Sequence, residues 1–182
     1  MNRPEKEKTV VLALGNPIRS DDGAGLLALQ CLQRDTRIDP SVSMVEGGTK
    51  GLELVPYLAG ASRLLVLDAV DGGVPPGTVL RMEREDLRFL PGSGSVHELA
   101  LSDILNALRI LDQEPQETVL LGVQPATTEL GVSLSSRVGA AVPALVEAGI
   151  AELARWGCVQ PDWADAKAGV AGKDLAVSHA RD

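Results

Sequence analysis

The sequence is poor in aromatic residues and has no excess of positive charge. Only 2% of its 182 residues are aromatic but 45% are hydrophobic, so the core must be built from aliphatic side chains. The net charge of −8 argues against nucleic acid and anionic membranes as partners. No apolar run is long enough to span a membrane, and the charged start MNRPEKEK lacks the apolar segment of a secretory signal. We therefore expect a cytoplasmic protein that binds neither nucleic acid nor membrane.

Cysteine and histidine are also scarce, which limits the catalytic chemistry. Cys31 and Cys158 form no Cys-x-x-Cys pair, and Cys31 lies in an apolar helical pattern, so we interpret both as buried or idle thiols. The two histidines are His97 and His179, which gives little support to Ser–His or Cys–His catalysis. There is no G-x-S-x-G, H-E-x-x-H or Walker sequence. Gly15–Gly25 is not a G-x-G-x-x-G motif, and its acidic pair would repel a pyrophosphate.

Short apolar runs alternate with segments of helical periodicity along most of the chain. The runs predict strands at Thr9–Leu14, Ser43–Val45, Leu64–Leu67, Thr78–Met82 (an edge strand) and Thr118–Val123. The periodic segments predict helices at Ala24–Gln33, Gly51–Leu58, from the capping box Ser95-x-x-Glu98 to Leu111, and over about Ser135–Trp156.

This alternation predicts an α/β fold with a single domain over residues 1–156. Its sheet should be twisted and mainly parallel, with about five strands and with helices on both faces. From residue 157 to residue 182 the apolar pattern lapses, so we expect this segment to be a loosely ordered tail.

Acidic residues follow three of the predicted strands. Asp21 and Asp22 follow the first strand, Glu46 follows the second, and Asp68 ends the third. The carboxyl ends of parallel strands share one edge of the sheet, and ligands bind there. A flexible Gly-Ser segment can bring His97 to the same edge. Asp22, Asp68 and His97 would then form a set of oxygen and nitrogen ligands that suits nickel or zinc before magnesium and leaves coordination positions open.

Each of these residues also has an ordinary structural interpretation. Carboxylates at a helix start usually interact with the helix dipole, and taken alone Asp21 and Asp22 favour that role. A strand-end Asp such as Asp68 is more often a turn former, and a lone His near a helix start is more often structural. The segment Glu46–Thr49 could be a turn in which Thr49 caps the next helix. The shared sheet edge is what favours a functional site.

Five segments occur in order between about Val10 and Leu153: GNPIRSDDGAG, EGGTKG, LLVLDAVDGGVPPGTV, SVHELALSDILNAL and LLGVQPATTELGVSLS. Together they resemble the hydrogenase maturation endopeptidase family. The resemblance implies a single α/β domain that removes a C-terminal peptide from the precursor of the nickel–iron hydrogenase large subunit after nickel insertion. It implies that the nickel is carried by the substrate rather than held by the free enzyme. It also assigns the metal-contacting and catalytic positions to Asp22, Asp68 and His97.

The resemblance suggests further substrate contacts. It leaves open which group activates water, and two alternative functions remain. Asp21 is expected to shape the turn or the local field, and it joins Glu46, Gly47, Gly48 and Thr49 as a candidate substrate contact. Many family members have Asp where this chain has Glu46, so the carboxylate is kept but moved outward by one methylene.

We expect a monomer. Either the metal or a carboxylate could activate water. A nickel-dependent chaperone that binds the same precursor without cutting it and a generic small-molecule-binding domain are the alternative functions.

Overall fold

The computed structural model describes residues 7–84, 86 and 96–160, and of residues 96–100 it describes only the backbone. Its five strands are β1 (Thr9–Leu14), β2 (Ser43–Gly48), β3 (Arg63–Ala69), β4 (Val79–Glu83) and β5 (Glu117–Val123). Its helices are the 3-10 helices η1 (Ser20–Gly23) and η2 (Leu52–Leu54) and the α-helices α1 (Ala24–Gln33), α2 (Val55–Leu58), α3 (Val96–Ile110) and α4 (Ser136–Arg155).

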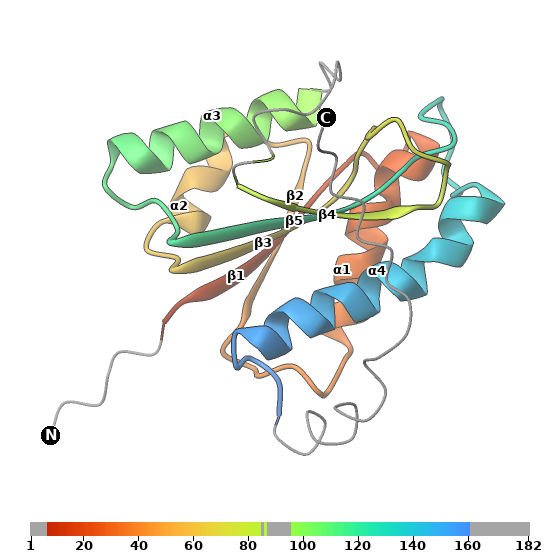
Figure 1. Ribbon diagram of the computed structural model, residues 1–182. Coiled ribbons are helices and arrows are strands. Elements are labelled where there is room, and N and C mark those ends of the chain that lie inside the picture. The colour runs from red at the N-terminus through yellow and green to blue at the C-terminus, as the bar shows by residue number, and fades with distance from the viewer. Residues whose placement is uncertain (1–6, 85, 87–95, 161–182) are drawn as a thin grey trace, which may run out of the picture.

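The strands form one sheet in the order β2-β1-β3-β5-β4. The pairs β1–β2, β1–β3 and β3–β5 are parallel, and only β4 runs antiparallel, along the outside of β5. The predicted edge strand is therefore confirmed as an edge, and the sheet is mainly parallel as expected. A short loop joins the end of α3 to the start of β5, and α3 runs antiparallel to β5 (Figure 1).

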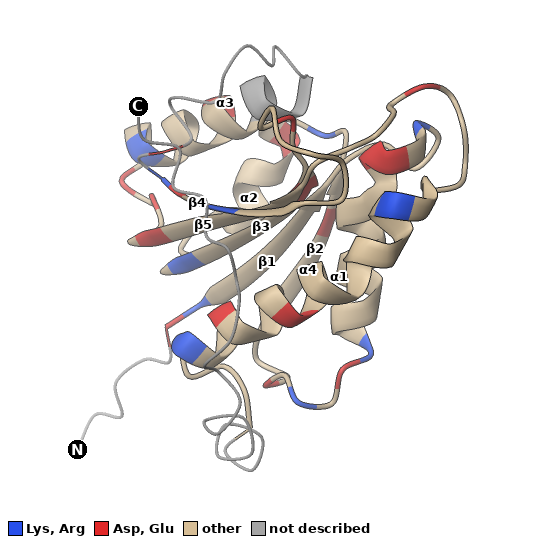
Figure 2. Cartoon of the chain, turned by 45° about the vertical axis from the view of Figure 1, so that its right-hand side comes forward, with Lys and Arg blue, Asp and Glu red and all other residues tan. Residues whose placement is uncertain are grey.

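The central strands are aliphatic along almost their whole length because helices cover both faces of the sheet. Every residue of β1 is buried, and in β3 and β5 charged residues occur only near the strand ends (Figure 2). The helices α1 and α4 cover one face, while α2 and α3 cover the other (Figure 1). Parallel strands that are buried on both faces have this continuous apolar sequence. The predicted α/β fold class is confirmed.

Two local predictions around the second strand are wrong. β2 does not end at Val45 but continues to Gly48, so most of the expected Glu46–Thr49 turn is a strand that pairs with β1 through a register shift. The next helix is not a single helix from Gly51 but the short elements η2 and α2. Neither has a side-chain cap, so Thr49 does not cap a helix.

The long C-terminal helix agrees closely with the prediction. The hydroxyl of Ser135 caps α4 by accepting a hydrogen bond from the backbone N–H of Val138 at 3.4 Å. The helix continues through Pro143 and Gly149. The predicted capping box of Ser95 and Glu98 lies outside the described residues and side chains. None of the helices in the described ranges combines the length and hydropathy that a membrane crossing requires.

The first residues of the expected tail pair with the domain. The backbone N–H of Asp39 donates to the carbonyl of Cys158 at 2.9 Å, and that of Gln160 donates to the carbonyl of Arg37 at 2.9 Å. Cys158 is buried, whereas Cys31 is exposed on the outer side of α1. Residues 157–160 are thus held against the domain, and residues 161–182 lie outside the described part of the chain.

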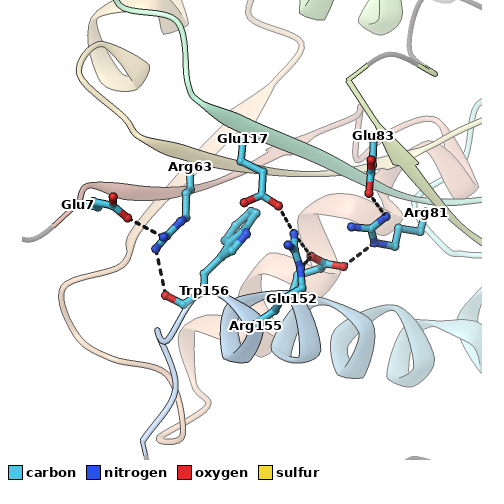
Figure 3. Close-up of polar contacts among 8 residues, drawn as sticks. All are labelled: Glu7, Arg63, Arg81, Glu83, Glu117, Glu152, Arg155 and Trp156. Atoms are coloured by element: carbon cyan, nitrogen blue, oxygen red, sulfur yellow. Dashed lines mark hydrogen bonds and ion pairs between the residues drawn. The ribbon is translucent and has the colours of Figure 1, made fainter.

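A buried carboxylate ties α4 to the edge strand β4. Glu152 accepts hydrogen bonds from Nε of Arg81 at 2.5 Å and from Nε of Arg155 at 2.9 Å (Figure 3). The same Arg81 also pairs with Glu83 at 2.9 Å, but the side chain of Glu83 is 59% exposed against 10% for Glu152. These two glutamates therefore offer one guanidinium group a buried partner and an exposed partner.

Glu152→Gln is expected to lower the free energy of unfolding by about 1–2 kcal/mol, because a buried charged partner of two guanidinium groups is lost. Glu83→Gln should change it by less than about 1 kcal/mol, since solvent screens an exposed pair. Urea unfolding of the two variants and the parent chain measures this difference. Equal effects would mean that burial of Glu152 has no energetic consequence.

Candidate active site at the carboxyl edge of the sheet

Two buried carboxylates lie where β1 and β3 reach the edge of the sheet. Asp68 is near the end of β3 and is 1% exposed, and Asp22 lies in η1, just after β1, and is 7% exposed. β1 and β3 are neighbouring parallel strands, so their carboxyl ends lie side by side. Ligands of open α/β sheets bind beyond this edge. The sequence therefore predicted the location of both carboxylates correctly.

Gly15 lies next to the backbone of Asp22 and the side chain of Asp68. Its φ of +122° is strained for any residue with a side chain, and a Cβ placed on it would lie 2.0 Å from the carbonyl oxygen of Asp22. The same Cβ would lie 3.8 Å from Oδ1 of Asp68. Gly15 therefore lies against the backbone of Asp22 and near the carboxylate of Asp68, and only glycine allows the approach to Asp22.

Backbone donors orient one oxygen of each carboxylate. The N–H of Asn16 donates to Oδ2 of Asp22 at 3.0 Å, and the N–H of Ala69 donates to Oδ1 of Asp68 at 2.8 Å. Asn16 shapes its own turn as well, because its Oδ1 accepts a hydrogen bond from the N–H of Ile18 at 3.2 Å. The sequence reasoning did not identify Asn16, although its place in a Gly-Asn-Pro turn was a usable signal.

The third predicted ligand, His97, is the second residue of α3, and its side chain lies outside the described residues. Among the side chains that are described, no group of three His, Cys, Asp or Glu residues is arranged to hold a metal ion. The set of Asp22, Asp68 and His97 therefore stays a prediction, of which the structure describes the two carboxylates.

The candidate substrate-contact residues of β2 line a cleft next to these carboxylates. Glu46, Gly47, Gly48 and Thr49 share a hollow of about 260 Å³ with Gly15, Asn16, Pro17, Leu26 and Lys50. Because the backbone of Asn16 is bonded to Asp22, one wall of the cleft is attached to the acidic site. A larger hollow of about 370 Å³ lies at the other end of the strands, around Ala59–Ser62, and contains none of the predicted site residues.

Asp21 has a different role from Asp22, although the two are adjacent in sequence. Its side chain is fully buried and accepts hydrogen bonds from the N–H groups of Ala126 (2.8 Å), Thr127 (3.1 Å) and Ser135 (2.6 Å) and from the Ser135 hydroxyl (2.9 Å). It joins η1 to the loop that follows β5. The candidate role of Asp21 in substrate contact is therefore corrected, because no part of its carboxylate reaches the surface; it shapes the turn instead.

The hydrogen bonds also determine the ionisation of Asp21. Burial raises the pKa of this carboxyl, but the donors from Ser135, Ala126 and Thr127 together lower it by more, so the pKa lies below its ordinary value of 3.8. A pKa that is lower in the folded state stabilises the fold at pH values above 3.8. That contribution is lost as the pH falls through the pKa of the folded state.

Asp21→Asn is expected to lower the free energy of unfolding by about 2–3 kcal/mol at neutral pH, because an amide cannot accept all four hydrogen bonds and buried donors lose their partner. The difference from the parent chain should shrink as the pH falls below 3.8 and then through the lower pKa of the folded parent, where its carboxylate becomes protonated. Urea titrations at several pH values test this, with the exposed Asp103→Asn as control. A difference that does not change with pH would contradict the assignment.

Comparison with known proteins agrees with this architecture. Residues 28–152 match the family model described as hydrogenase maturation protease. The chain is 39% identical over 151 residues to the hydrogenase expression/formation protein HoxM of Cupriavidus necator, covering 81% of this chain and 75% of that protein. It is 30% identical to the hydrogenase 2 maturation protease of Escherichia coli K12, covering 80% of this chain and 90% of that protein.

Solved structures show the same fold. The E. coli hydrogenase maturating endopeptidase HybD superimposes with a TM-score of 0.78 and 30% identity, covering 82% of this chain and 94% of that one. The [NiFe] hydrogenase maturation protease HybD of Thermococcus kodakarensis gives a TM-score of 0.65 at 31% identity, over 80% and 97% of the two chains. The chain therefore belongs to the hydrogenase maturation protease family, as its five motifs predicted, and is a peptidase of hydrogenase maturation.

Proposed function

We propose that this peptidase removes the C-terminal extension of a nickel-loaded hydrogenase large-subunit precursor. The observation that carries the proposal is that Asp22 and Asp68 are both buried at the carboxyl ends of neighbouring parallel strands, with Gly15 next to both residues. Two buried carboxylates beside an open cleft offer a binding site for a cation and for the chain attached to it.

The chemistry of these side chains suits nickel that arrives as part of the substrate. Carboxylate oxygens and an imidazole nitrogen are acceptable ligands for a borderline divalent metal, and three such ligands leave its coordination shell incomplete. Asp22, Asp68 and His97 would add their ligands to those that the precursor already provides. Nickel then identifies the correct substrate, because only a loaded precursor can use all of these ligands.

Binding the nickel also positions the peptide bond. The segment that extends beyond the metal would enter the cleft lined by Glu46–Thr49, next to the wall formed by Asn16. Fixing the metal and the following chain together converts a loose encounter into an oriented one, which lowers the barrier substantially. The exposed carboxylate of Glu46 would contact the extension.

The same residues can assist hydrolysis in two ways. A carboxylate can accept the proton of the attacking water, and the bound cation can polarise the carbonyl of the scissile bond. Water adds to the carbonyl carbon, the carbon–nitrogen bond breaks, and the proton passes to the leaving amine. The products are the mature subunit with a new carboxyl terminus and the released peptide.

Incubation with purified precursor, with and without nickel, tests this function. We expect the chain to shorten the nickel-loaded large subunit and to leave the nickel-free subunit intact. Stable binding of loaded precursor without shortening would support the chaperone alternative. If neither precursor is bound nor cut, a small-molecule-binding domain becomes the better interpretation, and thermal stabilisation by a metabolite would identify it.

A further inference from the structure

Three large aliphatic side chains are exposed on two loops beside the acidic site. Ile18 is 56% exposed, Leu130 is 81% exposed and Val132 is 85% exposed. Ile18 belongs to the loop between β1 and η1, and the other two belong to the loop between β5 and α4. We call these three residues the apolar loop patch.

The two loops are bonded to each other along their backbones. The N–H of Gly131 donates to the carbonyl of Ile18 at 3.0 Å, and the N–H of Ser20 donates to the carbonyl of Gly131 at 2.8 Å. The hydroxyl of Ser20 donates to the carbonyl of Glu129 at 3.0 Å. These bonds form a parallel bridge between Arg19 and Gly131. The backbone therefore holds the loops together without any help from the exposed aliphatic side chains.

The bridge brings the three residues of the patch into neighbouring segments. The bridge sets the backbone of Ile18 against Gly131, which lies between Leu130 and Val132 in the sequence. Ser20 has a φ of 47°, an unfavourable conformation for a residue with a side chain, and its two hydrogen bonds maintain it.

Asp21 makes the patch continuous with the proposed active site. Its carboxylate binds Ala126, Thr127 and Ser135, near both ends of the loop that carries Leu130 and Val132. The next residue in the sequence is Asp22. Asp22 and the apolar loop patch are thus parts of one hydrogen-bonded unit.

We propose that the apolar loop patch is a docking surface for the body of the hydrogenase large-subunit precursor. This inference rests on the proposed function. A peptidase that cuts one bond of a folded protein is contacted by that protein around its site, and the patch adjoins that site through the backbone. An aliphatic surface gives affinity without adding charge next to the acidic ligands. The cleft along β2 receives the extension, and the patch receives the folded part of the same substrate.

The test compares two double variants, each of which replaces two exposed aliphatic side chains by serine at a different place on the surface. The patch variant is Leu130→Ser with Val132→Ser. The control is Ile110→Ser with Leu111→Ser, which are 80% and 54% exposed at the end of α3, at the opposite end of β5. Steady-state cleavage of nickel-loaded precursor gives KM and kcat, biolayer interferometry gives the dissociation constant for the precursor, and thermal melts confirm folding.

We expect the patch variant to raise KM and the dissociation constant about 10-fold or more, with kcat within about 2-fold and an unchanged melting temperature. The control should match the parent chain. An unaltered patch variant, or equal losses in both variants, would overturn the docking surface. If sedimentation shows that the parent chain is a dimer and the patch variant is a monomer, a second copy occupies the surface and the inference fails. If the parent chain binds precursor but does not cut it, the proposed function fails while the binding data still decide the docking surface.

Discussion

Asp22→Asn is expected to reduce kcat/KM for precursor processing by about 100-fold or more while the domain stays folded. The variant removes the charge that we propose binds the cation but keeps an oxygen that can accept the hydrogen bond of Asn16. Loss of one proposed ligand would misplace the scissile bond, and small misplacements have effects of this size. Loss of a helix-end carboxylate should change the free energy of unfolding by only about 0.3–1 kcal/mol. A cleavage gel and a thermal melt on the same samples separate the two effects.

His97→Ala should behave in the same way, and Asp103→Asn serves as the control because it removes an exposed carboxylate on α3. Near-parental cleavage by Asp22→Asn would mean that Asp22 is not a ligand. Activity that is lost only together with the fold would favour the structural interpretation of the acidic pair.

Gly25→Ala is expected to destabilise the domain by about 3 kcal/mol or more. A Cβ at Gly25 would lie 2.5 Å from the carbonyl oxygen of Leu67 and 2.8 Å from that of Leu14. Both atoms are backbone of the central strands, so neither can move aside, and overpacking of this kind is costly. Urea unfolding measures this loss of stability. Processing should be lost as well, because Asp22 lies in η1, just before the contact of Gly25 with the strands.

Gly139→Ala is the matched control, since Gly139 also lies in a helix but nothing lies within 4 Å of its added Cβ. It should stabilise the chain by about 0.5–1 kcal/mol, the ordinary preference of a helix for alanine over glycine. A Gly25→Ala variant as stable as Gly139→Ala would show that α1 does not press on the sheet as the structure indicates.

Local patterns predicted the elements well where burial and periodicity agree. The strand Thr9–Leu14 and the helix Ala24–Gln33 have the predicted bounds. The prediction failed at Glu46–Gly48, because two glycines indicate a turn, whereas pairing with β1 keeps the segment extended. Tertiary contacts override local preference at such positions.

The candidate site was predictable to the extent that strand topology determines it. Asp22 and Asp68 were placed correctly because the carboxyl ends of neighbouring parallel strands must meet. The partners of Asp21 were not predictable, since Ala126 and Ser135 are more than a hundred residues away and carry no local signal. The exposure of Leu130 was not predicted for a similar reason. The sequence does not show whether an apolar loop residue is buried or exposed, because that depends on its neighbours in the fold.

We expect this chain to hydrolyse the nickel-loaded precursor with a water molecule that is activated at the edge of the sheet where Asp22 and Asp68 lie. Processing in H₂¹⁸O followed by mass spectrometry of both products measures this directly. We expect one ¹⁸O atom in the new carboxyl terminus of the large subunit, an unlabelled released peptide, and at least about 100-fold slower formation of both products with Asp22→Asn. An intact precursor with the parent chain, or labelled products formed equally by Asp22→Asn, would contradict it.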